Sequence, residues 1–393
     1  MADTDERLTA CTILVVEDDR VNAEIIGQHL QHAGYQHIFF AKNGRIAIEM
    51  TLELRPDLVI LDMVMPEMDG FEYCQKIRAM PAFAAMPILV QTGLERQDYK
   101  LRAFTMGASD YITKPVHGEE LAARVRAHLL NKILFEEVSA RERKMREELR
   151  AAQAMQERLM PSAEQLGTLQ QQYTLDIAGH FESSSEMGGD YWGAHMLGKQ
   201  RMALYMLDFS GHGTAAAINV FRIHTLMQEL TAHANEPGDF VTLLNRHLHP
   251  LIERSQFATF FYGVIDIEAN SLEYAAAAAP PVLMYRRKEQ HPEWLQVDGI
   301  PLGVLSNASY ETIVTAFGPG DVLVAFSDCM IETPGSNGEV ICHNMIKDCT
   351  EGALSAPAAN PAQNILQHSL EMFRAHSSAP LRDDLTMSVY YRK

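Results

Sequence analysis

The chain has 393 residues, of which 47% are hydrophobic, and a formal net charge of −18. This length exceeds what one hydrophobic core supports and predicts two or three domains. Residues 1–116 contain 17 acidic and 11 basic side chains, and residues 117–160 contain 8 acidic and 9 basic ones. Residues 161–393 are the most acidic part, with 26 acidic and 13 basic side chains. No broad basic surface is expected, which argues against nucleic acid as a direct partner.

The acidic N-terminal sequence lacks the apolar core of a signal peptide, and no segment reaches the ~18 apolar residues of a membrane span. The cysteines are odd in number and show no Cys-x-x-Cys spacing: Cys11, Cys74, Cys329, Cys342 and Cys349. These features predict a reduced, cytoplasmic protein without structural zinc and without a membrane partner.

Short apolar runs alternate with helical patterns in residues 1–117. The runs lie at 12–16, 38–40, 58–61, 88–92 and 110–112. Such runs between helices are typical of buried parallel strands, so we expect a doubly wound α/β domain with five parallel strands. Ligands of these sheets bind at the carboxyl ends of the strands.

Polar side chains follow the predicted strands at that edge: Glu17, Asp18, Asp62, Thr92 and Lys114. Three carboxylates would converge there beside one lysine. Carboxylate oxygens are the ligands that hard divalent cations prefer. The pattern therefore predicts a hard-cation site beside a positive charge.

Four motifs in residues 10–130 resemble the receiver domain of two-component response regulators. They are Val15-Val16-Glu17-Asp18, the segment 61–70, Gln91-Thr92-Gly93 and Thr113-Lys114-Pro115. The resemblance implies a flavodoxin-like receiver over residues 1–117. It also implies a histidine kinase or phosphotransfer protein as the phosphodonor.

The same resemblance assigns roles to the strand-end residues. Asp62 is the expected phosphoacceptor, and Lys114 and the Thr92 hydroxyl are expected to bind the phosphoryl oxygens. An aspartyl phosphate needs a metal and a cation to neutralise its added charge. The expected Mg²⁺ ligands are Asp18, Asp62 and the Val64 carbonyl, with Glu17 helping through water. The family also has an aromatic switch at the position of Tyr111 and a cis bond at Lys114–Pro115.

Residues 118–160 carry a charged helical pattern that stops at Pro161. A heptad register places these residues at core positions: Phe135, Val138, Met145, Leu149, Ala152 and Leu159. Glu142 and Gln156 are polar residues at core positions of the same register. The pattern predicts a long linker helix that forms a marginal parallel coiled coil, and hence a homodimer. A lone charged helix lying on its own domain is the alternative.

Residues 161–393 contain strand-like segments with acidic residues at their ends. The clearest lie at 202–207, 258–265, 272–277, 322–326 and 387–391, with an Ala-rich helix from 214 to about 231. The acids that follow or precede strands are Asp190, Asp208, Asp328 and Asp383. We expect an α+β sandwich with these acids gathered at one edge.

Ordered motifs here resemble the metal-dependent protein phosphatase (PP2C-like) fold in its sporulation-protein-E-type branch. They are Gln-x-x-Leu-x-Pro at the helix end, Gly-Gly-Asp-Tyr, Asp-x-Ser-Gly-His-Gly, Pro-Leu-Gly, Pro-Gly-Asp, Ser-Asp-x-x-x-Glu and Asp-Asp-x-Thr. The resemblance implies a serine/threonine phosphatase with two Mn²⁺ or Mg²⁺ ions. The implied ligands are the four acids and the Phe209 carbonyl, with Asp208 bridging the ions. Metals so placed activate water for attack on phosphorus without a protein nucleophile.

Two departures from this family bear on activity. Cys329 replaces a common Gly, and if that position needs a positive φ the Cys is strained. The family's Asn-Ala-Gly-His segment is Ala276-Ala277-Ala278-Ala279 here. Neither change removes a metal ligand. His212 is either a general acid or a packing residue.

Three functions follow as hypotheses. The first is a phosphatase that is controlled by Asp62 phosphorylation and acts on a serine-phosphorylated anti-sigma-factor antagonist. The alternative is a non-catalytic adaptor of the RssB-like type, which has a decayed phosphatase domain and binds a sigma factor for proteolysis. Retention of all four acids favours catalysis. A DNA-binding regulator is disfavoured because no basic recognition helix is apparent.

Overall fold

The computed structural model describes residues 2–93, 97–211, 213–296, 298–335, 340, 343–355, 358–377 and 380–393, without the side chains of 2–4 and 97–100. The chain divides into two compact units, Met1–Met145 and Arg146–Lys393. Below, these are called the N-terminal unit and the C-terminal unit. None of the helices in the described part of the chain combines the length and apolarity that a transmembrane segment requires.

The predicted five-stranded parallel sheet forms the centre of the N-terminal unit, and its strand order is β2-β1-β3-β4-β5. The strands are β1 (Thr12–Val16), β2 (His37–Ala41), β3 (Leu58–Asp62), β4 (Ile88–Thr92) and β5 (Asp110–Thr113). The helices are α1 (Ala2–Thr9), α2 (Arg20–His32), α3 (Gly44–Leu54), α4 (Gly70–Arg78), α5 (Gln97–Thr105) and the start of α6, with a 3₁₀ turn η1 (Pro81–Phe83). Among the described elements of this unit, α1 and the turn η1 have no counterpart among the predicted elements.

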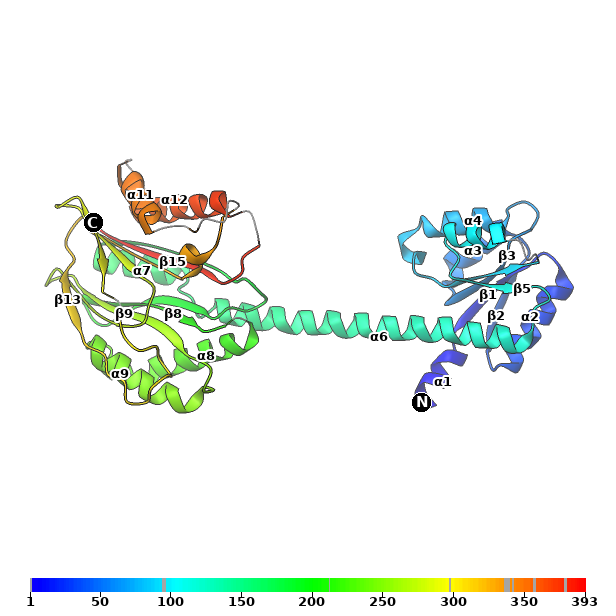
Figure 1. Cartoon of the computed structure of the whole chain (residues 1–393), viewed down its shortest axis with the longest axis horizontal. Coiled ribbons are helices and arrows are strands. Elements are labelled where there is room, and N and C mark those ends of the chain that lie inside the picture. The colour runs from blue at the N-terminus through cyan, green and yellow to red at the C-terminus, as the bar shows by residue number, and fades with distance from the viewer. Residues whose placement is uncertain are drawn as a thin grey trace. The chain divides into compact units, whose positions relative to one another are not determined.

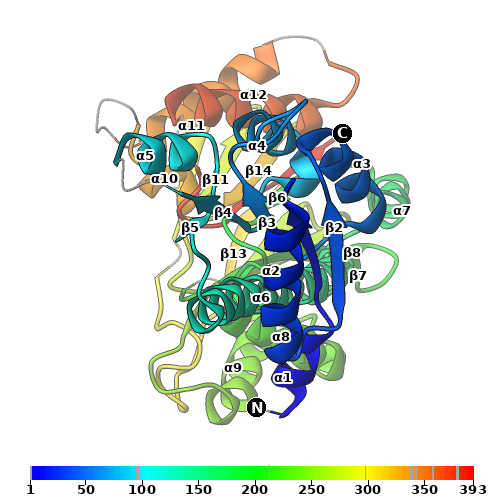
Figure 2. The same cartoon turned by 90° about the vertical axis from the view of Figure 1, so that its right-hand side faces the viewer.

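Helices cover both faces of this sheet (Figure 1, Figure 2). One face packs against α3, α4 and α5, through side chains that include Ala47, Cys74 and Ala103. The other packs against α1, α2 and α6. Because consecutive strand residues point to opposite faces, each buried strand feeds both cores, which explains its continuous apolar run.

Helix α6 extends from Gly118 to Glu157, 40 residues in all. Its first turns belong to the N-terminal core, where Leu121, Val125, Leu129 and Ile133 are buried at four-residue spacing. The helix ends three residues earlier than Met160, the end expected from the sequence. A capping box at Ser162 and Gln165 then starts α7 (Ala163–Tyr173).

The C-terminal unit stacks two five-stranded antiparallel sheets, of order β13-β10-β9-β8-β7 and β12-β11-β14-β15-β6. The strands are β6 (Leu175–Glu182), β7 (Asp190–Met196), β8 (Arg201–Phe209), β9 (Ala258–Asp266), β10 (Ser271–Ala277), β11 (Val282–Arg286), β12 (His291–Leu295), β13 (Ile313–Ala316), β14 (Val322–Phe326) and β15 (Leu385–Arg392). The helices are α7, α8 (Thr214–Glu229), α9 (Pro237–Leu248), α10 (Cys329–Glu332), α11 (His343–Ser355) and α12 (Pro361–His376), with 3₁₀ turns η2 (Thr231–His233) and η3 (His249–Leu251).

The alternation of side chains along β8 shows how the layers form. Ala203, Tyr205 and Leu207 face a core shared with α8 and α9, whereas Met202, Leu204 and Met206 face the second sheet. A third core joins that second sheet to α11 and α12. The unit is therefore a four-layer α+β sandwich, which confirms the predicted fold class.

Candidate functional site

The acids at the carboxyl edge of the N-terminal sheet lie together. Each of Glu17, Asp18 and Asp62 has a carboxylate oxygen within 4.8 Å of one from the other two. Neighbouring strands β1 and β3 bring them there, and Asp19 caps α2 by accepting hydrogen bonds from the backbone N–H groups of residues 21 and 22. Three clustered carboxylates fit a hard divalent cation.

Lys114 completes this N-terminal site. Its Nζ lies 2.6 Å from Asp62 Oδ2 and 2.9 Å from Glu17 Oε2, and the Lys114–Pro115 bond is cis. Burial acts to lower the pKa of Lys114, but its bonds to the two carboxylates outweigh this and raise it. Burial raises the pKa of Glu17, and Lys114 offsets part of that rise. A fixed ammonium beside Asp62 is therefore available to a new anionic group.

The other predicted residues of this site lie just after β3, at the end of β4 and in β5. The Val64 N–H points to Asp62 Oδ1 at 3.4 Å, and the Val64 side chain is exposed. Thr92 ends β4, and its carbonyl accepts a hydrogen bond from the Lys114 N–H at 2.9 Å. Tyr111 lies near α6, because the Arg124 guanidinium carbon is 5.7 Å from the centroid of its ring.

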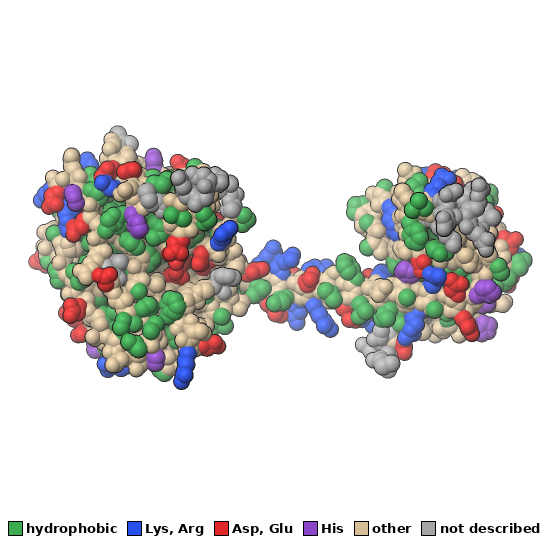
Figure 3. Space-filling view, viewed as in Figure 1, with side chains coloured by type: hydrophobic (Ala, Val, Ile, Leu, Met, Phe, Trp, Pro, Cys, Tyr) green, Lys and Arg blue, Asp and Glu red, His purple; other side chains and the backbone are tan. Residues whose placement is uncertain are grey.

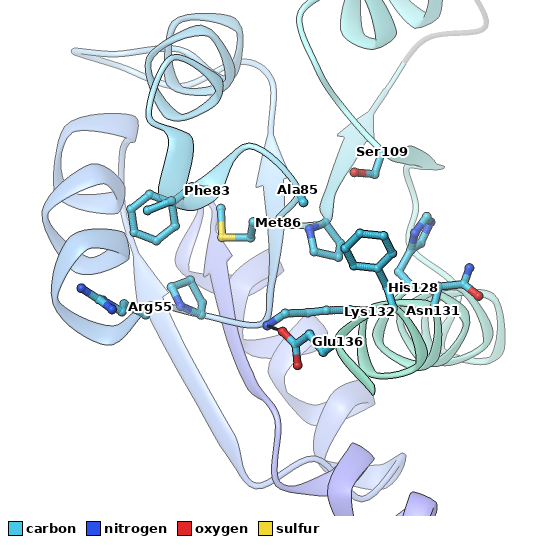
Figure 4. A pocket seen from close by; sticks show the side chains of 13 residues that line it. Arg55, Phe83, Ala85, Met86, Ser109, His128, Asn131, Lys132 and Glu136 are labelled. Atoms are coloured by element: carbon cyan, nitrogen blue, oxygen red, sulfur yellow. Dashed lines mark ion pairs between the residues drawn. The ribbon is translucent and has the colours of Figure 1, made fainter. Parts of the chain in front are cut away.

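A large cavity of this unit lies away from these carboxylates. It has about 610 Å³ and opens beside residues that precede β3, β4 and β5, at the opposite edge of the sheet from Asp62. In Figure 4, Lys132 and Glu136 of α6 lie along one side of it and Phe83 and Met86 along another. Cavity size therefore does not identify the reactive site of this unit.

In the C-terminal unit, Asp190 begins β7 and pairs in register with Asp208 near the end of β8. Asp190 is only 1% exposed, and the Thr386 hydroxyl donates to its Oδ2 at 2.5 Å. Asp328 precedes α10, and Asp383 lies just before β15. Chain segments far apart in sequence thus bring the four predicted acids to one region.

The pKa values show how strongly these acids act on one another. Burial, followed by the charges of Asp328 and Asp383, raises the pKa of Asp208 to about 8. Burial and Asp383 raise that of Asp328 to about 6, and burial with Asp208 raises that of Asp190 well above its usual range. Crowded carboxylates of this kind suit a divalent cation, although among the described residues no three of these acids bring their oxygens within 4.8 Å of one another, as Glu17, Asp18 and Asp62 do.

The Gly188–Gly189 dipeptide next to Asp190 is held from two sides. Gln156 of α6 is 1% exposed and pairs with Gly188 twice: Nε2 donates to its carbonyl at 2.6 Å, and Oε1 accepts from its N–H at 3.2 Å. Asp384 accepts from the Gly189 N–H at 2.6 Å. A Cβ on Gly189 would lie 2.9 Å from the Phe209 carbonyl oxygen, so glycine lets this backbone approach a predicted metal ligand.

Neither Asp384 nor Gln156 was predicted to take part in the site. Asp384 is adjacent to the predicted ligand Asp383, and the motif alone does not separate their roles. Gln156 belongs to the Gln-x-x-Leu-x-Pro motif, but it also fits the heptad register and was therefore predicted to interrupt the coiled-coil seam. The structure places it on its own unit instead, where Leu159 also packs against the core.

The two departures from the family have different outcomes. Cys329 begins α10 and is absent from the positive-φ residues of the described chain, so the expected strain does not arise there. Ala278, which replaces the family's Gly, has φ +50° and carries the strain instead. Ala279 and Pro280 line a small cavity with Asp208. His212 and Cys342 lie outside the described residues.

Family models match both parts of the chain. The model for stage II sporulation protein E (SpoIIE) matches residues 198–393, and that for the response regulator receiver domain matches residues 13–126. Among solved structures, the SiaA-PP2C domain of Pseudomonas aeruginosa has 15% identity and a TM-score of 0.56, covering 65% of this chain and 99% of that one. At this identity the match shows the fold alone.

Curated relatives match about a third of the chain. The DNA-binding dual master transcriptional regulator RpaA of Synechocystis is 38% identical over 117 residues, which are 30% of this chain and 48% of that protein. Response regulator PleD of Caulobacter vibrioides is 35% identical over 130 residues, 33% of this chain and 28% of that protein. The chain thus spans less than half the length of either relative.

Proposed function

We propose that this chain, which joins a response-regulator receiver domain to a SpoIIE-type, PP2C-like phosphatase domain, is a metal-dependent serine/threonine protein phosphatase controlled by phosphorylation of Asp62. We assign the receiver to residues 1–117, the helical linker to 118–160 and the phosphatase domain to 161–393. The observation that carries the proposal is the convergence of four acids, because the charges of Asp208, Asp328 and Asp383 raise the pKa values of Asp190, Asp208 and Asp328.

The acids fit divalent ions, because PP2C-like domains are typically metal-dependent and the donors here are hard oxygens. The proposed ligands are Asp190, Asp208, Asp328, Asp383 and the Phe209 carbonyl, for two Mn²⁺ or Mg²⁺ ions. When bound, such ions would activate a water molecule and neutralise charge that develops on the phosphoryl group.

The chain's own residues hold this donor set in place. Thr386 fixes the orientation of the Asp190 carboxylate, and Gln156 and Asp384 fix the loop that leads into it. Asp208 lies in a strand between two others, so its backbone is rigid. Water, rather than a protein side chain, is the nucleophile in this proposal.

In the receiver, Asp62 accepts the phosphoryl group from a histidine kinase or phosphotransfer protein. Lys114 then pairs with the phosphoryl oxygens, and the Thr92 hydroxyl binds another of them. Glu17, Asp18, Asp62 and the Val64 carbonyl would hold Mg²⁺, which balances the added charge. The cluster of three carboxylates beside Lys114 supports these roles.

The proposed substrate is a serine-phosphorylated anti-sigma-factor antagonist in the cytoplasm, so the protein would alter sigma-factor availability. We further propose a homodimer through α6, in which the apolar stripe of the linker forms a coiled coil. Side chains at three of its core positions are more than half exposed in the single chain: Phe135 at 68%, Val138 at 55% and Met145 at 63%. Burial against a second copy would remove this apolar surface from water.

The deciding experiment is an assay of the intact wild-type protein with Mn²⁺ on a phosphoserine protein. Asp208→Ala should eliminate hydrolysis, and Asp62→Asn should abolish labelling by acetyl phosphate. If the wild type binds a sigma factor but hydrolyses nothing with any metal, the non-catalytic adaptor is the correct function.

A further inference from the structure

Exposed hydrophobic side chains from three segments of the phosphatase domain form a surface that is called here the 251–257 patch. It consists of Ile218, Leu251, Phe257, Val304 and Leu305, each 39–51% exposed. Figure 3 shows hydrophobic side chains gathered on this unit below a group of acidic side chains. Apolar groups of this kind mark sites of protein interaction.

Hydrogen bonds hold the three segments of the patch next to one another. Asn219, which follows Ile218 on α8, donates from Nδ2 to Gln256 Oε1 at 3.0 Å, and Arg222 Nη1 donates to the Leu251 carbonyl at 3.0 Å. On the other side, His249 Nδ1 lies 2.7 Å from the Gly303 carbonyl oxygen. The loop that carries Leu251 and Phe257 is therefore fixed between α8 and the segment 303–305.

The patch is continuous with the acid cluster. The Ser210 N–H donates to the Phe257 carbonyl at 2.9 Å, and the Phe257 N–H donates to Ser210 Oγ at 3.0 Å. Ser210 follows the ligand pair Asp208 and Phe209 directly. A protein whose side chain reaches the acids must therefore lie close to Phe257.

The charge at the margin of the patch differs from that of the rest of the domain. Residues 161–393 carry 26 acidic and 13 basic side chains. At the patch, Arg222 donates to the Leu251 carbonyl and is exposed, and Arg254, three residues after Leu251, is exposed together with its neighbour Glu253. Two guanidinium groups favour an anionic partner, and a phosphorylated protein is one.

We propose that the 251–257 patch docks the phosphoserine protein substrate while its phosphoryl group enters the acid cluster. This inference rests on the proposed function. The acids supply chemistry but no recognition of the protein around the phosphoserine. Burial of the apolar patch, with the arginines at its rim, would supply that recognition.

The test compares two substrates of the intact protein, p-nitrophenyl phosphate and a serine-phosphorylated anti-sigma-factor antagonist. Leu251→Glu and Val304→Glu place charges on the patch away from the acids. Each should lower kcat/KM for the phosphoprotein about tenfold or more, mainly through KM, relative to p-nitrophenyl phosphate. Val314→Glu is the matched control, because Val314 lies on β13 outside the patch and is 64% exposed.

The outcomes separate the docking surface from the activity itself. If wild type hydrolyses neither substrate, the proposed function fails. If it hydrolyses both and Leu251→Glu changes the two rates equally, or behaves like Val314→Glu, the docking surface is wrong. Loss of a dimer in Leu251→Glu, measured by light scattering, would show that a second copy covers the patch and would also overturn the proposal.

Discussion

Two adjacent aspartates at the start of β15 have different surroundings, and this difference predicts different effects of their removal. Asp384 is 2% exposed and accepts hydrogen bonds from the N–H groups of Gly189 and Ser184 at 2.6 and 2.8 Å. Asp384→Ala should therefore destabilise the C-terminal unit by about 2 kcal/mol, because buried donors lose a charged acceptor. Asp383 accepts a hydrogen bond from the adjacent Asp384 N–H at 2.9 Å, and it repels Asp208 and Asp328 more strongly than Asp384 does.

Asp383→Ala is the matched comparison for that prediction. Its removal relieves repulsion, so the metal-free unit should be as stable as wild type or more stable, while hydrolysis is lost. Both tryptophans, Trp192 and Trp294, lie in the C-terminal unit, so tryptophan fluorescence in urea measures its unfolding. Equal destabilisation by the two substitutions would contradict the assigned roles.

The acid cluster also predicts a pH dependence of stability. The pKa of Asp208 is raised from 3.8 to about 8. At a pH between these two values, Asp208 therefore keeps its proton in the folded state and has lost it in the unfolded state. The contribution of Asp208 to the stability of the metal-free unit should therefore be greatest below the unfolded pKa and be lost as pH rises toward about 8. The melting temperature in EDTA should be about 5 °C or more lower at pH near 8 than near 5.5.

Asp208→Asn is the control for this pH effect. It removes the titrating group, so its melting temperature should change less with pH than that of wild type. Added Mn²⁺ should stabilise the wild type most at the higher pH, because binding requires deprotonated carboxylates. A wild-type melting temperature that rises with pH in EDTA would contradict the prediction.

The strain at Ala278 predicts a stabilising substitution. Its φ of +50° disfavours any residue with a Cβ, and the family has Gly at this position. Ala278→Gly should raise the free energy of unfolding by about 0.5–1 kcal/mol, measured by tryptophan fluorescence in urea. The neighbouring Ala277→Gly, in β10 and without a positive φ, should instead lower it. Stabilisation by both substitutions, or by neither, would contradict this reading of the backbone.

At the scale of elements, the last turn of α6 is tied through Gln156 to the Gly188–Gly189 loop, which leads into the proposed metal ligand Asp190. Gln156→Ala breaks both hydrogen bonds to Gly188 and should raise the Mn²⁺ concentration needed for half-maximal hydrolysis about tenfold, as is typical when a support of a metal ligand is lost. Gln153→Ala is the control, since Gln153 lies one turn earlier and its side chain donates to Glu157 of the same helix. The same Mn²⁺ requirement in both variants would show that the contact is structural only.

The strands and the acids at their ends are well predicted from the sequence, because hydrophobic periodicity and burial directly determine where a strand begins and ends. The apolar runs at 12–16 and 322–326 become buried strands, and Asp62 and Asp208 lie at or near strand ends. Gln156 shows the limit of this approach. A heptad pattern records which helix face is buried but not whether that face meets a second copy or the chain's own domain. The hydrogen bonds of Asp384 and the positive φ of Ala278 depend on loop geometry, and hydrophobic periodicity carries no information about loops.

At the scale of the whole molecule, one helix serves both domains. Leu121, Val125 and Ile133 bury its first half in the receiver core, and Gln156 anchors its last turn in the phosphatase domain. Arg124, near Tyr111 of the proposed switch, also belongs to this helix. A change at Asp62 that alters the packing of Tyr111 would therefore act on the element that holds the Gly188–Gly189 loop.

This connection predicts that an interrupted helix uncouples the domains. Leu149→Pro removes a hydrogen bond and costs the helix about 3 kcal/mol in a stretch, residues 140–151, where side chains are mostly exposed, so each domain should stay folded. Acetyl phosphate should then still phosphorylate Asp62 but no longer change the rate of phosphoserine hydrolysis. Leu149→Ala keeps the helix and is the control, which should respond to acetyl phosphate as wild type does. If the Pro variant retains full control by Asp62, α6 is only a tether and the signal must pass by another route.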